Sequence, residues 1–239
     1  RTFIQVNKAN DYDYLFITNI IDNKKYLLDS DYIYGSMLST LLKKDKKICL
    51  VFFNQTNFSI KNISTKIQNH KNVSYYFFNN KVNFIKDLKC FYILIELLLE
   101  IFKNKILINK KIFPFLIYSL FEEETLANVR ISNFMKKISK NNFKKAILTY
   151  EGHSYERNII KQLKNNSNSI TIFAYLHSGI YETSHGIYQT DYPSSILPDK
   201  YLFSGKVGLE EFKRITNKYT NSDCEIFGSP RFFHPRKKK

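Results

Sequence analysis

Short runs of β-branched and aromatic residues recur along the chain, and longer segments with helical spacing lie between them. The runs are continuously apolar rather than alternating, which is typical of strands covered on both faces of a sheet. They predict strands at residues 14–20, 48–53, 73–78, 146–150, 170–176, 200–204 and 224–228.

The intervening segments predict helices at residues 34–44, 91–104, 121–140, 154–165 and 207–219. Segment 121–140 begins with acids and ends with lysines, the order that a helix dipole favours, and Ser154 is a suitable N-cap for segment 154–165. Strands that alternate with helices predict an α/β fold: a Rossmann-like, mostly parallel sheet with helices on both faces. One such unit accounts for nearly the whole length.

The most apolar window of the chain, residues 91–102, lies within one of these predicted helices. It contains Glu96 and Glu100 and is too short to span a bilayer. We therefore expect it to form a buried helix.

The formal net charge is +16, from 37 basic and 21 acidic side chains. Such a balance suggests an anionic partner: nucleic acid, acidic lipid headgroups or a phosphorylated substrate. Most basic residues are dispersed, which is typical of a solvated surface, and the one concentrated run is Pro235–Lys239. The aromatic residues lie inside apolar runs, and no RRM, KH, zinc-finger or basic-zipper signature is present. We therefore expect no nucleic-acid partner.

Small and polar residues follow four successive predicted strands. In chain order, the residues that directly follow these strands are Glu151-Gly152-His153, His177-Ser178, Gly205 and Ser229-Pro230-Arg231. Ligands of open α/β sheets bind beyond the carboxyl ends of the strands, so these residues are expected to share one rim. Glycine lets backbone approach a ligand, and helix N-termini offer N–H groups to phosphate. The predicted substrate-binding residues are Gly152, His153, Ser178, Gly205, Ser229 and Arg231.

Glu151 is the first candidate for a catalytic residue. A carboxylate just past a strand and beside His153 is suited to act as a general base or to bind sugar hydroxyls. The alternative is that Glu151 only caps the following helix, because acids favour that end. His177 is the second candidate: it could deprotonate a hydroxyl or contact a phosphate, or it could be a structural histidine. Arg231 could pair with a phosphate or lie in a surface loop.

Several reaction classes lack their motifs in this chain. There is no G-x-x-x-x-G-K-[ST], no G-x-G-x-x-G after the first strand and no G-x-S-x-G, which disfavours P-loop, classical dinucleotide and triad enzymes. Neither H-x-x-x-H nor H-E-x-x-H occurs, and the three cysteines form no C-x-x-C. We expect no metal and no cofactor.

The same strand ends carry a resemblance to a known class of proteins. "YEGHSYE" (150–156), "YLHS" (175–178), "LPDKYLFSGKVG" (197–208) and "IFGSPR" (226–231) occur in the order seen in bacterial surface-carbohydrate glycosyltransferases of the GT-B type. The chain is most similar to capsule and lipopolysaccharide transferases, including those that handle CMP-activated acidic sugars. Such enzymes have two Rossmann-like domains, and the amino-terminal one usually takes the acceptor. The resemblance implies an acceptor-side domain at 1–228, with 229–239 as the start of an inter-domain crossing or a basic tail.

The resemblance also implies an activity. We expect from it the activity of an inverting, metal-independent glycosyltransferase, which would move a sugar from a nucleotide sugar to a surface-polysaccharide glycan or lipid-linked acceptor. Tyr150-Glu151-Gly152 matches two positions of the (D/E)-(D/E)-G motif that supplies the base in some bacterial sialyltransferases. His177 matches the histidine of a His-Gly pair that provides the base in polyol-phosphate polymerases. Glu151 is thus the expected base, and His177 the second candidate.

Two alternatives to this activity remain open at this point. The first is a non-catalytic Rossmann-like binding module from a truncated enzyme, and the second is a nucleic-acid-binding protein. For the glycosyltransferase we expect a cytoplasmic location. Contact with an anionic membrane would place it at the inner face, because positive charge is attracted to acidic lipid.

Overall fold

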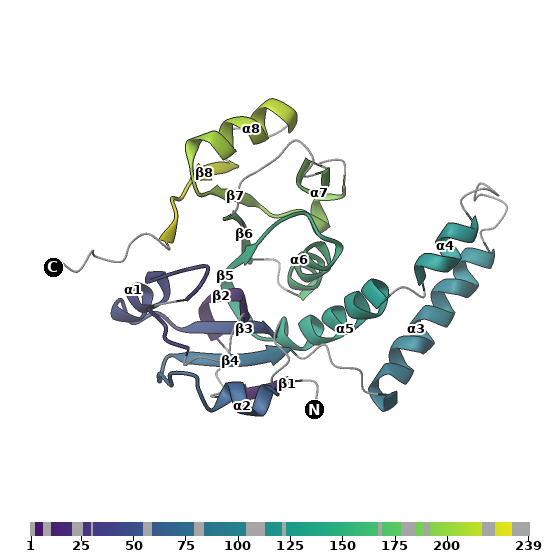
Figure 1. The fold of residues 1–239 in the computed structure, drawn as a ribbon, viewed down its shortest axis with the longest axis horizontal. Coiled ribbons are helices and arrows are strands. Elements are labelled where there is room, and N and C mark those ends of the chain that lie inside the picture. Colours follow the sequence, from purple (N-terminus) through teal and green to yellow (C-terminus); the bar gives the residue numbers. More distant parts are fainter. Residues whose placement is uncertain are drawn as a thin grey trace.

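A computed structural model describes residues 3–6, 11–20, 26–29, 31–54, 59–78, 84–103, 113–120, 123–166, 169–177, 185–188, 192–216 and 223–230. Strands and helices alternate through most of this length (Figure 1). The strands are β1 (Phe3–Val6), β2 (Asp11–Ile20), β3 (Ile48–Asn54), β4 (Val73–Phe78), β5 (Asn142–Thr149), β6 (Thr171–Leu176), β7 (Lys200–Phe203) and β8 (Cys224–Ile226). The helices are α1 (Met37–Lys43), α2 (Ile60–Ser64), α3 (Phe84–Lys103), α4 (Phe113–Leu120), α5 (Glu123–Ile138), α6 (Ser154–Asn166), α7 (His185–Tyr188), the 3-10 helix η2 (Ser194–Ile196) and α8 (Lys206–Thr216).

The strands form one sheet in the order β1-β4-β3-β2-β5-β6-β7-β8. Neighbours are parallel throughout, except that β1 runs antiparallel to β4. The chain winds outward from β2 to β4, returns to the middle at β5 and then winds outward in the other direction. The winding therefore reverses between β2 and β5, which is where open α/β sheets form their ligand crevice. The predicted Rossmann-like, mostly parallel sheet is confirmed; β1 was not predicted.

Helices cover both faces of the sheet, as predicted. On one face, α5, α6, α7 and α8 contribute side chains such as Met135, Ile160 and Phe212 to a core that extends from β4 to β8. On the other face, Leu38 of α1 and Ile63 of α2 pack over β2, β3 and β4. Strands covered on both sides are apolar at nearly every position, and all six residues of β4 are buried.

A buried tyrosine links the two strands at which the winding reverses. The Tyr34 hydroxyl lies 2.7 Å from the carbonyl oxygen of Ile17 in β2 and 3.2 Å from that of Ile147 in β5. Burial raises the pKa of Tyr34 well above its ordinary value, so the hydroxyl remains a proton donor to these carbonyls.

Asp31 holds the segment that carries Tyr34. Its buried carboxylate accepts the backbone N–H groups of Ile33 (2.8 Å) and Tyr34 (2.6 Å). It also accepts hydroxyl protons from Thr18 (3.2 Å) and Tyr26 (2.6 Å). These bonds hold residues 31–34 in a turn. The helix α1 therefore begins only at Met37, three residues after the predicted start at Tyr34.

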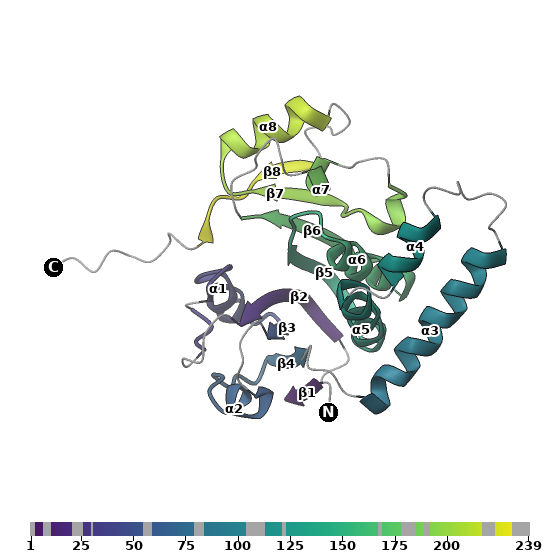
Figure 2. The ribbon, with the colours of Figure 1, turned by 45° about the vertical axis from the view of Figure 1, so that its right-hand side comes forward.

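The expectation that residues 91–102 are buried is wrong for much of α3. Leu94 is buried, but Tyr92, Ile95 and Leu99 are more than half exposed. Among the described elements, α3 packs against α5 and α4, and Figure 2 shows α3 and α4 on the far side of α5 from the sheet. An apolar composition indicates that a helix can be buried, but it does not supply the neighbours that would cover every side.

We predict that Tyr34→Phe lowers the free energy of unfolding by about 1–2 kcal/mol, because two buried carbonyl oxygens lose the hydroxyl near them. Urea unfolding of the full chain measures this change. Tyr118→Phe, at an exposed tyrosine of α4, is the matched control and should change stability by less than about 0.5 kcal/mol. Equal effects of the two substitutions would contradict the proposed role of Tyr34.

Candidate functional site

The turn between β5 and α6 contains Glu151, Gly152 and His153, and a buried carboxylate organises it. Glu156, only 1% exposed, accepts the backbone N–H of Glu151 (3.0 and 3.1 Å to its two oxygens) and that of His153 (2.8 Å). A glutamate in the first helical turn that bonds back to the residue before the helix is half of a capping box. Glu156 thus fixes the path of the backbone on both sides of Gly152.

The prediction that Ser154 caps α6 is wrong. Ser154 is the first residue of the helix, and its hydroxyl oxygen accepts a hydrogen bond from Asn128 Nδ2 (2.8 Å) in α5. The residue before the helix is His153, and its N–H group donates to the Glu156 carboxylate. The spacing of three residues from His153 to Glu156 is a signal that the sequence contains.

Gly152 packs directly against α7. Its φ is +81°, and a Cβ built there would lie 2.1 Å from the carbonyl carbon of Gly186. Both the positive φ and this contact require glycine. The close approach at Gly152 is therefore to another segment of the same chain.

Arg157 supports the turn from the helix side. Its guanidinium donates a hydrogen bond to the carbonyl oxygen of Gly152 and lies over the ring of Tyr192, 4.5 Å from the centroid. With Glu156 bonded to the N–H groups and Arg157 bonded to the carbonyl, the main chain of the turn has partners for both kinds of polar group.

The side chains of Glu151 and His153 face solvent from this fixed backbone. His153 Nε2 lies 3.3 Å from Glu151 Oε2, and the two side chains are 54% and 44% exposed respectively. The imidazole stacks on Tyr155, with ring centroids 5.5 Å apart and planes 15° apart, and Tyr155 in turn packs against Phe53. A carboxylate and an imidazole in contact at a surface can accept a proton and pass it on.

His177 lies at the same edge of the sheet as Glu151. Thr149 of β5 pairs with Tyr175 of β6, and the N–H of Tyr150 bonds to the carbonyl of Tyr175. Glu151 and His177 each come two residues after this pair, so they follow the ends of adjacent parallel strands. His177 is half-buried, and its ring lies 6.1 Å from that of Tyr175.

Gly205 and Ser229 follow the next two strands. Gly205 precedes α8, and a Cβ there would meet nothing within 4 Å. Ser229 is half-buried, next to Gly228, whose carbonyl accepts the Tyr175 hydroxyl (3.2 Å). Ser178 and Arg231 lie outside the described residues.

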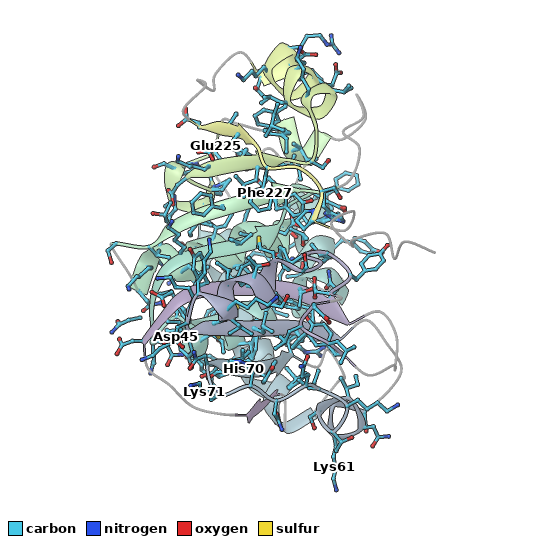
Figure 3. The ribbon with its side chains drawn as sticks, turned by 90° about the vertical axis from the view of Figure 1, so that its left-hand side faces the viewer. Asp45, Lys61, His70, Lys71, Glu225 and Phe227 are labelled. Carbon is cyan, nitrogen blue, oxygen red and sulfur yellow. The ribbon has the colours of Figure 1, made fainter. Side chains whose placement is uncertain are left out.

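The structure thus brings Glu151, Gly152, His153, His177 and Gly205 to the carboxyl edge of the sheet, with Ser229 just past β8. Figure 3 shows Phe227 beyond the end of β8, whereas Asp45, His70 and Lys71 lie at the opposite edge, before β3 and β4. Within the described part of the chain, no group of three or more His, Cys, Asp or Glu side chains could hold a metal ion.

A surface cavity of about 240 Å³ lies elsewhere, between α1 and the segments before β4. Its lining residues are Leu28, Asp29, Ser39, Leu42, Lys43, Gln68 and His70. None of them was predicted as a site residue, and none belongs to the turns that follow β5 to β8. The cavity therefore contributes nothing to the candidate site.

Burial gives Glu156 an unusual affinity for protons. It raises the pKa of the carboxyl from 4.5 to about 7, although the N–H groups of Glu151 and His153 and the neighbouring His153 side chain act in the opposite direction. The pKa of Tyr155 is also raised, first by burial and then by the nearby Glu156 and Glu151 carboxylates.

We predict a pH dependence of stability that Glu156→Gln removes. Because the pKa is higher in the folded state, the stabilisation due to Glu156 is complete below about pH 4.5 and is lost as the pH rises through about 7. The free energy of unfolding of the wild type should fall across this range relative to the variant, by at most about 3 kcal/mol. Urea unfolding at several pH values measures the slope.

Glu210→Gln is the control for this comparison, because Glu210 is an exposed glutamate of α8. Its slope should match that of the wild type. Parallel pH curves for wild type and Glu156→Gln would show that the carboxyl titrates alike in the folded and unfolded states.

No protein-family model matches the chain, and no curated protein matches it. Among solved structures, the chain is similar to α,α-trehalose 6-phosphate synthase from Burkholderia multivorans, with 9% sequence identity and a TM-score of 0.40. The match covers 86% of this chain and 43% of the synthase, so the chain spans less than half the length of that enzyme.

Proposed function

We propose that this protein is a glycosyltransferase, or the acceptor-side part of one, that works at the carboxyl edge of its sheet. It would move a sugar from a nucleotide sugar to a hydroxyl group of a surface-polysaccharide or lipid-linked acceptor, with inversion and without a metal. The observation that carries the proposal is the solvent-facing Glu151–His153 pair, held on a fixed turn next to the reversal point of the sheet.

In the proposed reaction, the acceptor hydroxyl lies against the Glu151 carboxylate. The acceptor oxygen forms a bond to the anomeric carbon as the bond from that carbon to the nucleotide phosphate breaks. The nucleotide leaves with the electron pair, and the acceptor proton passes to Glu151. His153, 3.3 Å away, orients the carboxylate and can relay the proton to solvent.

Two further features support a role in chemistry rather than in capping alone. The carboxylate that bonds to the N–H group of His153, directly before α6, is that of Glu156 and not that of Glu151. His177 follows the adjacent strand and is the second candidate for the base. The motifs at these strand ends are the ones that resemble GT-B glycosyltransferases.

The charge developing on the departing phosphate would also need stabilisation. Gly205 precedes the eleven-residue helix α8, whose first N–H groups lie at the same edge of the sheet. A helix N-terminus of this kind can stabilise phosphate charge.

We predict that Glu151→Gln lowers the rate of sugar transfer by at least about 100-fold, because the amide cannot accept the hydroxyl proton. A screen of nucleotide sugars against the full chain, scored by released nucleotide in the presence of glycan acceptors, identifies the donor. The same assay is then run on the variant. Far-ultraviolet circular dichroism verifies that the fold is retained.

Asp45→Asn is the matched control, because it changes a carboxylate to an amide at the opposite edge of the sheet (Figure 3). Asparagine tolerates the positive φ of 55° at this position, and its side-chain oxygen can still accept the bond from Asn72. Near-normal transfer by Glu151→Gln would exclude Glu151 as the base. A wild-type chain that releases no nucleotide from any donor would contradict the proposed activity itself.

A further inference from the structure

Exposed apolar side chains are concentrated on two helices that carry none of the candidate site residues. Among the described residues, thirteen large hydrophobic side chains are exposed, and eight of them lie on α3 and α4. These eight are Leu88, Tyr92, Ile95, Leu97, Leu99, Phe102, Phe115 and Tyr118. Monomeric proteins rarely leave such a group together at the surface, so a partner for these helices is expected.

On α3 most of these side chains form a stripe. Leu88, Tyr92, Ile95, Leu99 and Phe102 follow one another at spacings of four and three residues, which places them on one face of the helix. Leu94, on another face, is buried. Figures 1 and 2 show α3 and α4 at the periphery, so the stripe lies on an outer part of the molecule.

The two glutamates of α3 lie beside the stripe rather than within it. Glu96 and Glu100 each follow a stripe residue by one position, about 100° around the helix. A hydrogen bond with Glu96 raises the pKa of Tyr92. A helix that rests on its stripe would therefore keep both glutamates in water.

The charge of the surrounding sequence is positive. Residues 84–120 contain six lysines and three acidic residues, and the whole chain has a net charge of +16. Two copies of such a chain repel each other, whereas an anionic bilayer attracts each of them. Tyr92, Phe102, Phe115 and Tyr118 also make half of the exposed group aromatic, as in helices that lie at a lipid–water interface.

We propose that the arm formed by α3 and α4 is a docking surface for an anionic lipid bilayer. The stripe would lie in the interfacial region, with α3 parallel to the membrane plane. No helix in the described ranges is long and apolar enough to cross a membrane. Docking would bring the candidate site close to a lipid-linked acceptor, and this consequence rests on the proposed function. The docking itself does not depend on that function.

The chain contains no tryptophan, so a single introduced tryptophan reports on its own position. Tyr92→Trp places the probe in the stripe, and Val207→Trp places it at an exposed position of α8 as the control. With vesicles of phosphatidylcholine and phosphatidylglycerol, the first variant should show a blue-shifted emission that brominated lipid quenches. The second should show neither change. Vesicles of phosphatidylcholine alone should give a weaker response.

A second pair of variants tests the energetics. Replacing Ile95 and Leu99 together by serine should weaken vesicle binding at least about tenfold, because apolar contact with the lipid is lost. Val207→Ser should not change binding. Circular dichroism should be unaltered in both variants. Nucleotide release with a soluble acceptor should be unaltered in the double serine variant of α3, so the result stands apart from any failure of the proposed function.

Two outcomes would overturn the proposal. Binding to vesicles without a spectral change in Tyr92→Trp would mean that dispersed basic residues, and not the arm, contact the lipid. A blue shift without vesicles that grows with protein concentration, together with dimers in sedimentation, would mean that a second copy covers the stripe.

Discussion

The pairing of β2 with β5 determines where everything else in this protein lies. From β2 the chain winds outward to β4, and from β5 it winds outward in the opposite direction to β8. The pairing of β2 with β5 joins these two halves of the sheet. Tyr34 reinforces this junction with a hydroxyl beside a carbonyl oxygen of each strand, and Asp31 holds Tyr34 in place. Because parallel strands end at one edge, the junction also brings the turn after β5 next to the reversal point. The chemistry proposed for Glu151 depends on that placement.

Glu156 shows how the same turn combines rigidity with a cost in stability. Removing a carboxylate from water is unfavourable, and the N–H groups of Glu151 and His153 offset only part of this cost, since the pKa remains raised to about 7. In return, two N–H groups on either side of Gly152 gain a partner, and the Gly152 carbonyl is bonded to Arg157. The bonds to these two N–H groups are thus made by Glu156 and not by the side chains of Glu151 and His153, which face solvent. Preorganised groups of this kind are what a transfer reaction requires.

Much of the sheet could be predicted from the sequence, because strands covered on both faces form continuous apolar runs that are easy to locate. The predicted residues 73–78 are those of β4, and the other runs differ from the observed strands mainly at their ends. The antiparallel β1 and the helices α2, α4 and α7 were missed, since segments of four to eight residues carry too little periodicity. The start of α1 was misplaced because the Asp31 carboxylate bonds to nearby N–H groups and favours a turn over a helix.

The sequence predicted which edge of the sheet carries the candidate residues, but it did not predict that α3 is exposed. Strand order makes the location of Glu151, His177 and Gly205 a consequence of topology, so their shared edge follows once a parallel sheet is expected. The role of Glu156 was missed, although its spacing of three residues from His153 is that of a capping box. The exposure of α3 depends on which neighbours the fold supplies, and an apolar sequence describes equally well a helix covered by protein and one covered by lipid. What separates the two is the charge around the stripe, where lysines outnumber acids and the glutamates lie to one side.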